Sequence, residues 1–158
     1  MTSSRYASSG ITSPDATVLL LGGLPPGPAA ASYHPPAGHI FKLWQIFLDK
    51  VNPLTKIVHA PTLQQKILEV IGDLDNVSQG LEALMFAIYT IAVTSISDSD
   101  CETMFGEERL TLLTRYRSAT QRALIAANFI MTPDLVVLQA FVLYMVGITR
   151  VARNTLFW

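Results

Sequence analysis

The amino-acid sequence predicts an all-α fold, in which several helices pack around one core and a segment without regular structure precedes them. From His39 onward, apolar residues recur at i, i+3 and i+4, which is the spacing of an amphipathic helix. Capping residues, glycines and prolines separate these segments from one another. No segment shows the sustained alternation or the turn signals that are typical of strands and hairpins.

The N-terminal segment, residues 1–38, is rich in Ser, Pro, Gly and Ala, and we predict that most of it is disordered. Its prolines, five of them between positions 25 and 36, block regular structure. A short apolar segment at residues 18–24, "VLLLGGL", is expected either to form a strand or to dock elsewhere. The polar, serine-rich beginning lacks the apolar core of a secretory signal.

The first predicted helix covers residues 39–51, and Pro53 prevents it from continuing. Its polar positions fall mainly on one side, and its apolar positions form the opposite face: Ile40, Leu43, Trp44, Phe47, Leu48 and Val51. Trp44 lies at helical spacing from Phe41 and Phe47, and this grouping has two interpretations. Aromatic residues at such spacing are more often part of a core than of a ligand-binding box, so we assign all three to the core.

The second predicted helix begins with a capping box, in which Thr62 is the N-cap and Gln65 stands at N3. Its apolar stripe consists of Leu63, Ile67, Leu68 and Ile71. The third helix begins after Asn76 and Ser78 and extends to about Ile96. Because it is apolar on nearly all sides, we expect it to lie in the middle of the domain.

A short helix follows, with Ser99 and Glu102 as a second capping box and Gly106 as its stop. Glu107 and Glu108 then begin a long helix that extends to about residue 129. The acidic residues at its start favour this assignment, because negative charge is stabilising at a helix N-terminus.

In the last predicted helix, Thr132 is the cap and Pro133 occupies the first turn. This helix and the third one contain apolar stretches at residues 135–148 and 81–96 that raise the question of a membrane. Both stretches fall short of the roughly 20 residues that a membrane-spanning helix needs. We therefore interpret them as core helices, and a membrane-associated helical protein stays an alternative.

The composition combines 50% hydrophobic residues with only 15% charged residues in 158, whereas about 25% charged residues is usual. Either an unusually large part of the chain is interior, or part of its surface is covered by something else. The net charge of −1 provides no basic excess for binding phosphate groups, so direct binding to nucleic acid is not expected.

No catalytic, cofactor-binding or metal-binding site is predicted, and the chain is not expected to be an enzyme. The three histidines, His34, His39 and His59, are interpreted as boundary and loop residues. Cys101 is the single cysteine, and its acidic neighbours oppose thiolate formation, so we assign it a structural role. The acidic stretch around it lacks the ligand spacing and mid-loop glycine of an EF-hand, and "LLGGLPPG" lacks the lysine of a phosphate-binding loop.

The basic residues cluster at one place only, in "RYRSATQRAL", which contains Arg115, Arg117 and Arg122. One interpretation is a solvated helix face, partly paired with Glu107, Glu108 or other acids. The other is a surface that binds a partner, and the three arginines are the candidate residues for it.

Several stretches, taken together, resemble a known family. Residues 34–70, "HPPAGHIFKLWQIFLDKVNPLTKIVHAPTLQQKILEV", are similar to the opening of the middle homology region of fungal zinc-cluster transcription factors. The later stretches "LEALMFAIYTIAVTSISDSDC" and "FGEERLTLLTRYRSATQRALIAANFI" fit the same region in order and spacing. The resemblance covers roughly residues 18–147, and the joint order of the motifs is more specific than any single motif.

This resemblance implies a helical regulatory domain, at residues 39–158, of nuclear DNA-binding regulators that are often specific to a pathway or gene cluster, including clusters for secondary metabolism. The family binds its zinc through six cysteines in an N-terminal cluster, and Cys101 alone cannot supply it. No zinc-ligand role therefore transfers to this chain, and no cofactor is expected in it. The resemblance also implies a domain truncated at its C-terminal end.

The leading hypothesis is therefore a fragment of a transcription regulator that acts through protein contacts. Its partner is expected to be a second copy of the chain or a full-length relative. Contact with DNA or with a membrane is not expected. A helical enzyme or small-ligand carrier is the alternative from another class. Truncation also predicts that the isolated chain self-associates or is loosely packed.

Overall fold

A computed structural model describes residues 33–156 of the chain, with side chains as far as Arg153. Within these residues every regular element is helical, which confirms the predicted all-α class. The expectations for residues 1–32, including the apolar segment at 18–24, lie outside the described residues. The disorder expected for residues 33–38 is wrong, because Tyr33 packs against the core and a helix already begins at Ala37.

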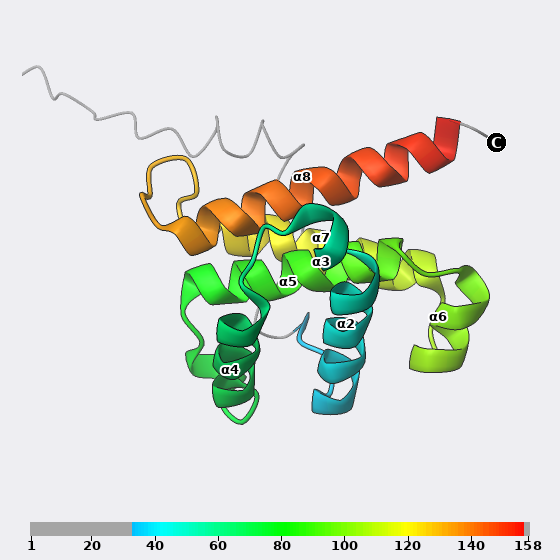
Figure 1. Ribbon diagram of the computed structural model, residues 1–158, viewed down its shortest axis with the longest axis horizontal. Coiled ribbons are helices and arrows are strands. Elements are labelled where there is room, and N and C mark those ends of the chain that lie inside the picture. The colour runs from blue at the N-terminus through cyan, green and yellow to red at the C-terminus, as the bar shows by residue number, and fades with distance from the viewer. Residues whose placement is uncertain (1–32, 157–158) are drawn as a thin grey trace, which may run out of the picture.

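The three longest helices lie side by side, and two others cross beneath them (Figure 1). The long helices are α5 (Gln79–Thr94), α7 (Arg109–Ala126) and α8 (Leu135–Leu156), and the crossing ones are α2 (Ala37–Lys50) and α4 (Ala60–Val70). Shorter elements connect them: α3 (Asn52–Thr55), η2 (Leu74–Asn76) and α6 (Asp98–Phe105). Helix α5 contacts α2, α7 and α8 and occupies the middle, as its all-round apolar sequence predicts.

Helix α5 is buried on all sides, because every residue in it except Gln79 and Glu82 is buried. Its two internal threonines do not violate this environment. The hydroxyl of Thr90 donates to the carbonyl of Phe86 and that of Thr94 to the carbonyl of Thr90, both at 2.8 Å. Burial without such hydrogen bonds would be unfavourable, so the helix satisfies its own polar side chains.

Helix α2 begins at Ala37, two residues earlier than expected, and its predicted apolar face is buried except for the half-buried Leu48. Trp44 and Phe47 belong to the core and stack with their ring centres 5.6 Å apart. The assignment of Phe41 to the core is wrong, because this ring is 40% exposed. Pro53 does not simply end the helix, since it stands in the first turn of α3, where a missing N–H is tolerated.

Both predicted capping boxes are wrong by a few residues. Helix α4 begins at Ala60 with His59 at the N-cap, so Thr62 is already helical. Pro61 stands in the first turn, where proline is tolerated. Helix α6 is capped by Ser97, whose hydroxyl accepts a hydrogen bond from the Asp100 amide, so Ser99 and Glu102 do not form the box. Nearby serines and threonines offer equivalent caps, and the sequence pattern does not rank them.

The stop of α6 is confirmed, since Gly106 has the left-handed conformation, with φ of 69°. Helix α7 is shorter than predicted at both ends and begins only after Glu108. Thr132 and Pro133 both precede α8 and are not its cap and first turn. Asp134 caps it instead, because its side chain accepts a hydrogen bond from the amide of Val136 at 2.9 Å.

Helix α8 corrects the expectation about length. It has 22 residues, and a 19-residue stretch of it (Leu135–Arg153) is long and apolar enough to cross a membrane by length and composition alone. Helix α5, with 16 residues, stays below that length. Hydrogen bonds attach α8 to the rest of the domain, among them one from the Gln121 amide to the Tyr144 hydroxyl at 2.7 Å. Such contacts are typical of a helix packed on a protein core.

Candidate functional site

A groove of about 360 Å³ lies where α4 faces the first turns of α5 and α8. Its volume is at the lower end of the range for small-molecule sites. Its apolar side chains come from all three helices and from Val58 before α4, and its polar groups come from α4, from α8 and from the residues just before each helix. The lining residues are Val58, His59, Thr62, Leu63, Lys66, Ser78, Leu81, Leu84, Asp134, Leu135, Val136 and Gln139.

Two close contacts join the helices that line this groove. The side-chain amide of Gln139 on α8 donates to the carbonyl of Ile57, just before α4, at 2.9 Å. Gly80, in the first turn of α5, lies directly against the start of α8. A β-carbon added at Gly80 would lie 3.0 Å from Asp134 Oδ2 and 3.2 Å from Val137 Cγ2. Glycine therefore permits the approach of these two helix ends.

We expect the substitution Gly80→Ala to destabilise the domain by about 1–3 kcal/mol, because the side chains of Asp134 and Val137 must give way to accept the methyl group. Urea denaturation checks this. Gly38→Ala is the matched control, since nothing lies within 4 Å of a β-carbon at Gly38 and the added methyl favours the helix. Equal or higher stability of Gly80→Ala would show that the helix ends are not in close contact.

His34 is buried against α5 and is more than the boundary residue that the sequence indicates. Its side chain is 2% exposed, and its ring stacks on Phe86 with the centres 4.3 Å apart. Its Nδ1 lies 3.3 Å from the Tyr89 hydroxyl, and its Nε2 lies 3.5 Å from Glu82 Oε1. These contacts attach the segment before α2 to the central helix.

The other two histidines lie elsewhere. His39, in the first turn of α2, meets the ring of Phe105 edge-on, with centres 5.2 Å apart. His59 caps α4, and its Nδ1 lies 2.8 Å from the Thr62 hydroxyl. Among the described residues no three His, Cys, Asp or Glu side chains come together as metal ligands would.

Two buried tyrosines lie beside the His34 contacts, with ring centres of Tyr89 and Tyr116 5.4 Å apart. Burial raises the pKa of Tyr116 to about 12, and burial, Tyr116 and Glu82 raise the pKa of Tyr89. Both phenols therefore stay protonated at neutral pH and serve packing and hydrogen bonding.

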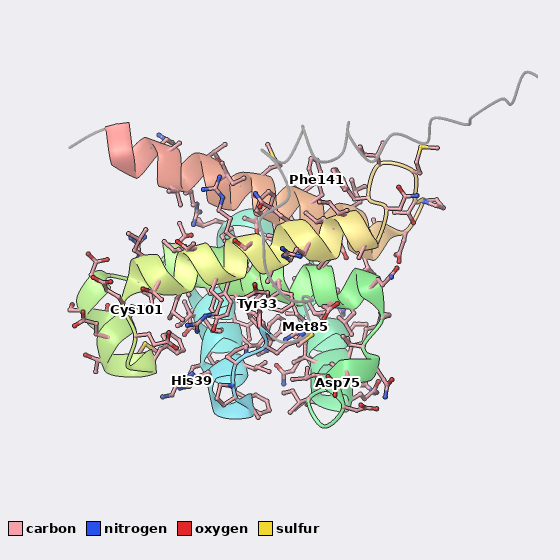
Figure 2. All side chains as sticks on the ribbon, turned by 180° about the vertical axis from the view of Figure 1, so that it is seen from behind. Tyr33, His39, Asp75, Met85, Cys101 and Phe141 are labelled. Atoms are coloured by element: carbon pink, nitrogen blue, oxygen red, sulfur yellow. The ribbon has the colours of Figure 1, made fainter. Side chains whose placement is uncertain are left out.

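Cys101 is fully buried in α6, and Figure 2 shows this helix at one end of the molecule. Burial is the main cause that raises the pKa of its thiol; Arg109 lowers the pKa, and Asp98, Glu107 and Glu102 raise it by smaller amounts each. A thiol in this environment is a poor nucleophile. These observations agree with the structural role that the sequence indicates.

The three arginines of the candidate partner surface do not form one cluster. Arg115 binds Glu107 through two hydrogen bonds of 3.0 and 2.6 Å, which is the pairing expected of a solvated helix face. Arg117 is exposed, and Arg122 is half-buried. Along the helix, Arg115 and Arg122 share a side because they are seven residues apart, whereas Arg117 lies on another side.

The pair of Glu107 and Arg115 predicts a small pH dependence of stability. Hydrogen bonding to Arg115 lowers the pKa of Glu107 in the folded state. A lowered carboxyl pKa stabilises the fold above the unfolded pKa of about 4.3, and this contribution is lost as pH falls through the folded pKa. Because both side chains are about a third exposed, we expect less than about 1 kcal/mol.

Urea denaturation of Glu107→Gln and of the unchanged chain measures this contribution between pH 7 and pH 3. The difference in unfolding free energy should be present at pH 7 and shrink in acid. Glu108→Gln, at the exposed N-cap of α7, serves as the control. A difference that is the same at both pH values would contradict the ion pair.

Arg109 is a structural residue that sequence reasoning missed. Its Nε donates to the carbonyl of Val93 at 3.1 Å and its Nη2 to the carbonyl of Thr94 at 2.9 Å. These carbonyls belong to the last turn of α5, which lacks partners within its own helix. A side chain at the first position of one helix thus caps another, and no local sequence pattern signals this.

The chain is similar to several fungal transcription factors. The aurofusarin cluster transcription factor of Gibberella zeae is 45% identical over 125 residues, which are 79% of this chain and 19% of that protein. The pyriculol/pyriculariol biosynthesis cluster transcription factor 1 of Pyricularia oryzae is 43% identical over 144 residues, 89% of this chain and 19% of that protein. A C6 finger domain transcription factor of Aspergillus niger is 32% identical over 145 residues, with the same coverage.

The chain is a homologue of fungal C6 zinc-cluster transcription factors. The family resemblance found in the sequence is thereby confirmed. The chain spans 16–19% of the length of the zinc-cluster regulators that it matches. No family model matches the chain. No solved structure matches it either.

The zinc of C6 regulators does not fit the residues that the structure describes. A C6 cluster needs several thiolates close together, whereas Cys101 is buried alone among apolar and acidic neighbours. Among the described residues, the feature shaped to hold another molecule is the groove with its apolar lining and polar rim.

Proposed function

We propose that the chain acts in transcription regulation as a helical regulatory segment that binds proteins and does not itself contact DNA. The observation that carries this proposal is the 43–45% identity to named cluster transcription factors over 79–89% of the chain. The all-helical fold with several exposed apolar side chains is consistent with a protein-binding role.

The distribution of positive charge supports the absence of DNA contact. Proteins that bind DNA neutralise phosphates with clustered Lys and Arg side chains. Here the net charge is −1, Arg109 is hydrogen-bonded to α5, and Arg115 is paired with Glu107. Of the three candidate arginines only Arg117 is exposed, and it remains our candidate for a surface that contacts a protein partner.

A chimera tests the proposal. The matching segment of the Gibberella aurofusarin regulator is replaced by this chain, and transcripts of the genes under that regulator are measured in its own host. We expect transcription to be retained, and to fall in a second chimera that carries Arg117→Glu. A chimera with normal protein level and no transcription would contradict the regulatory role.

DNA binding is tested separately with the isolated chain. Fluorescence anisotropy with promoter DNA bound by the Gibberella regulator should show only weak binding that disappears as salt is raised, because no cationic surface holds the phosphates. The intact regulator is the positive control. Specific DNA binding by the isolated chain would contradict the proposal that the chain does not itself contact DNA.

We also propose that the chain is not an enzyme, carries no cofactor, works in the nucleus and pairs with itself or with a full-length relative. The relatives' names as transcription factors and the scattered histidines support the first three points. Microscopy of a fluorescent fusion in a fungal host tests the location, for which we expect nuclear signal when a full-length relative is co-expressed.

The groove between α4, α5 and α8 favours a second candidate function, the binding of a small, mostly apolar effector with a polar group. Lys66 provides a positive charge at its rim and Asp134 a negative one. The anionic dye 1-anilinonaphthalene-8-sulfonate is a suitable probe. Saturable 1:1 binding that Lys66→Glu weakens, and that Lys50→Glu outside the groove leaves unchanged, would support an effector site.

A further inference from the structure

Helix α8 lies along the outside of the bundle, and the other described helices pack on one side of it (Figure 1). Its outer face is apolar and exposed over the first half of the helix: Leu135 is 64% exposed, Leu138 56%, Val142 37% and Met145 42%. Phe141, on the same helix, is labelled in Figure 2 and is only partly buried. Four large exposed side chains in a row on one helix indicate a surface that binds something.

The exposed positions form one continuous stripe along α8, and a stripe of this shape can be covered by a second helix. In α8 these positions are 135, 138, 142, 145, 149 and 152, with Arg153 beside the last. The steps alternate between three and four residues, which is the a/d pattern of a coiled-coil seam. Helix α8 follows it for about 30 Å, since each residue rises about 1.5 Å. We call these six positions the α8 seam.

The α8 seam is complementary to itself in the antiparallel direction. When two copies are paired about a point between residues 143 and 144, Leu135 faces Ala152, Leu138 faces Thr149, and Val142 faces Met145. Each large side chain at one end thus meets a small one at the other end, and the middle pair is of similar size. Pairing of large with small side chains favours close packing of the two helices.

The charges favour the same direction. Asp134 stands at the beginning of α8 and Arg153 in its last turns, and residues 135–156 contain no acidic residue. The antiparallel register brings Asp134 of one copy level with Arg153 of the other, whereas a parallel pair would place like charges together. The opposite helix dipoles add to this preference.

We propose that two copies of the chain associate through an antiparallel pair of α8 seams. One helix pair of this length buries less surface than the roughly 1,600 Å² of a standard interface, so the dimer is weak and depends on concentration. A membrane is the less favoured occupant, because Gln139 and Tyr144 hold the other side of α8 to the domain through hydrogen bonds. The inference rests on the self-pairing proposed above and specifies its interface, and it does not depend on the role in transcription.

Sedimentation velocity of the full chain over a wide range of concentrations tests the association. We expect a monomer–dimer equilibrium that Leu138→Glu shifts at least tenfold toward monomer. The control is Leu54→Glu, a leucine on α3 outside the seam that is 74% exposed, against 56% for Leu138. Circular dichroism verifies that both variants stay folded. A monomer at all concentrations, or the same shift from Leu54→Glu, would overturn the proposal.

Cross-linking tests the direction. Leu138→Cys and Thr149→Cys are made as separate variants, and Cys101 does not interfere because it is fully buried. The antiparallel register predicts a disulfide-linked dimer only when the two variants are mixed and oxidised. A disulfide within either variant alone would indicate a parallel pair and overturn the register. Binding of the seam to phosphatidylcholine–phosphatidylserine vesicles in place of dimerisation would overturn the choice of partner.

Discussion

Replacing Phe86 with alanine is expected to lower the free energy of unfolding by about 3–5 kcal/mol, the largest effect we predict for a single side chain. Phe86 is fully buried in the middle of α5, stacks on His34 and meets Tyr89 edge-on with ring centres 5.5 Å apart. Its removal leaves a cavity between elements that all depend on α5. It also removes the surface on which the buried ring of His34 rests.

Urea or thermal denaturation followed by circular dichroism measures this effect. Phe41→Ala is the matched control, because the same deletion is made on a ring of α2 that is 40% exposed. We expect the control to lose about 1 kcal/mol or less, as substitutions at the surface usually do. Similar losses for the two variants would mean that α5 is not the centre of the core.

Replacing Arg109 with alanine is expected to lower the free energy of unfolding by about 2–4 kcal/mol. A hydrogen bond from a charged group contributes about 1.5–3 kcal/mol, and the two bonds of Arg109 together contribute less than twice that value because one side chain makes both. Its guanidinium is hydrogen-bonded to two carbonyls at the end of α5 and lies 3.6 Å from Asp98. The positive charge also complements the negative end of the helix dipole.

Two further variants separate the causes. Arg109→Lys keeps the charge and loses the forked geometry, so we expect it to recover less than half of the loss. Arg117→Ala removes an exposed arginine of the same helix and should change stability by about 0.5 kcal/mol or less. If Arg109→Ala and Arg117→Ala behave alike in denaturation, the cap on α5 is not important for stability.

Features with a regular local period were predictable from the sequence. The apolar face of α2 follows from 3.6-residue spacing, and the central place of α5 follows from its lack of a polar side. The stop at Gly106 follows from the freedom of glycine at positive φ. These features depend on residues close to one another in the chain.

Helix starts were predicted less well, since several neighbouring residues serve equally as caps. Thr62 and Ser99 were chosen where His59 and Ser97 are the caps. The choice depends on how the preceding segment enters the helix, which tertiary packing decides. Pattern alone places such a boundary only within a few residues.

The candidate site was least predictable, because its contacts join residues far apart in the chain. In the sequence Gly80 is an ordinary glycine near a helix start, and only the structure shows that the first turn of α8 lies beside it. The sequence indicates a boundary residue at His34, and only the structure shows its contacts with Phe86 and Tyr89. The apolar sequence of α8 was assigned to the core, and only the packing of its inner side shows which positions stay outside.

The complete burial of α5 has a consequence for how the domain opens. Because α2, α7 and α8 all pack on this helix, none of them can detach without exposing it to water. The four helices therefore unfold as one cooperative unit, and backbone amides of α5 exchange their hydrogens only when the whole unit opens. Helix α4 and the turn at η2 lie at the edge of this unit, where exchange can proceed by local fraying.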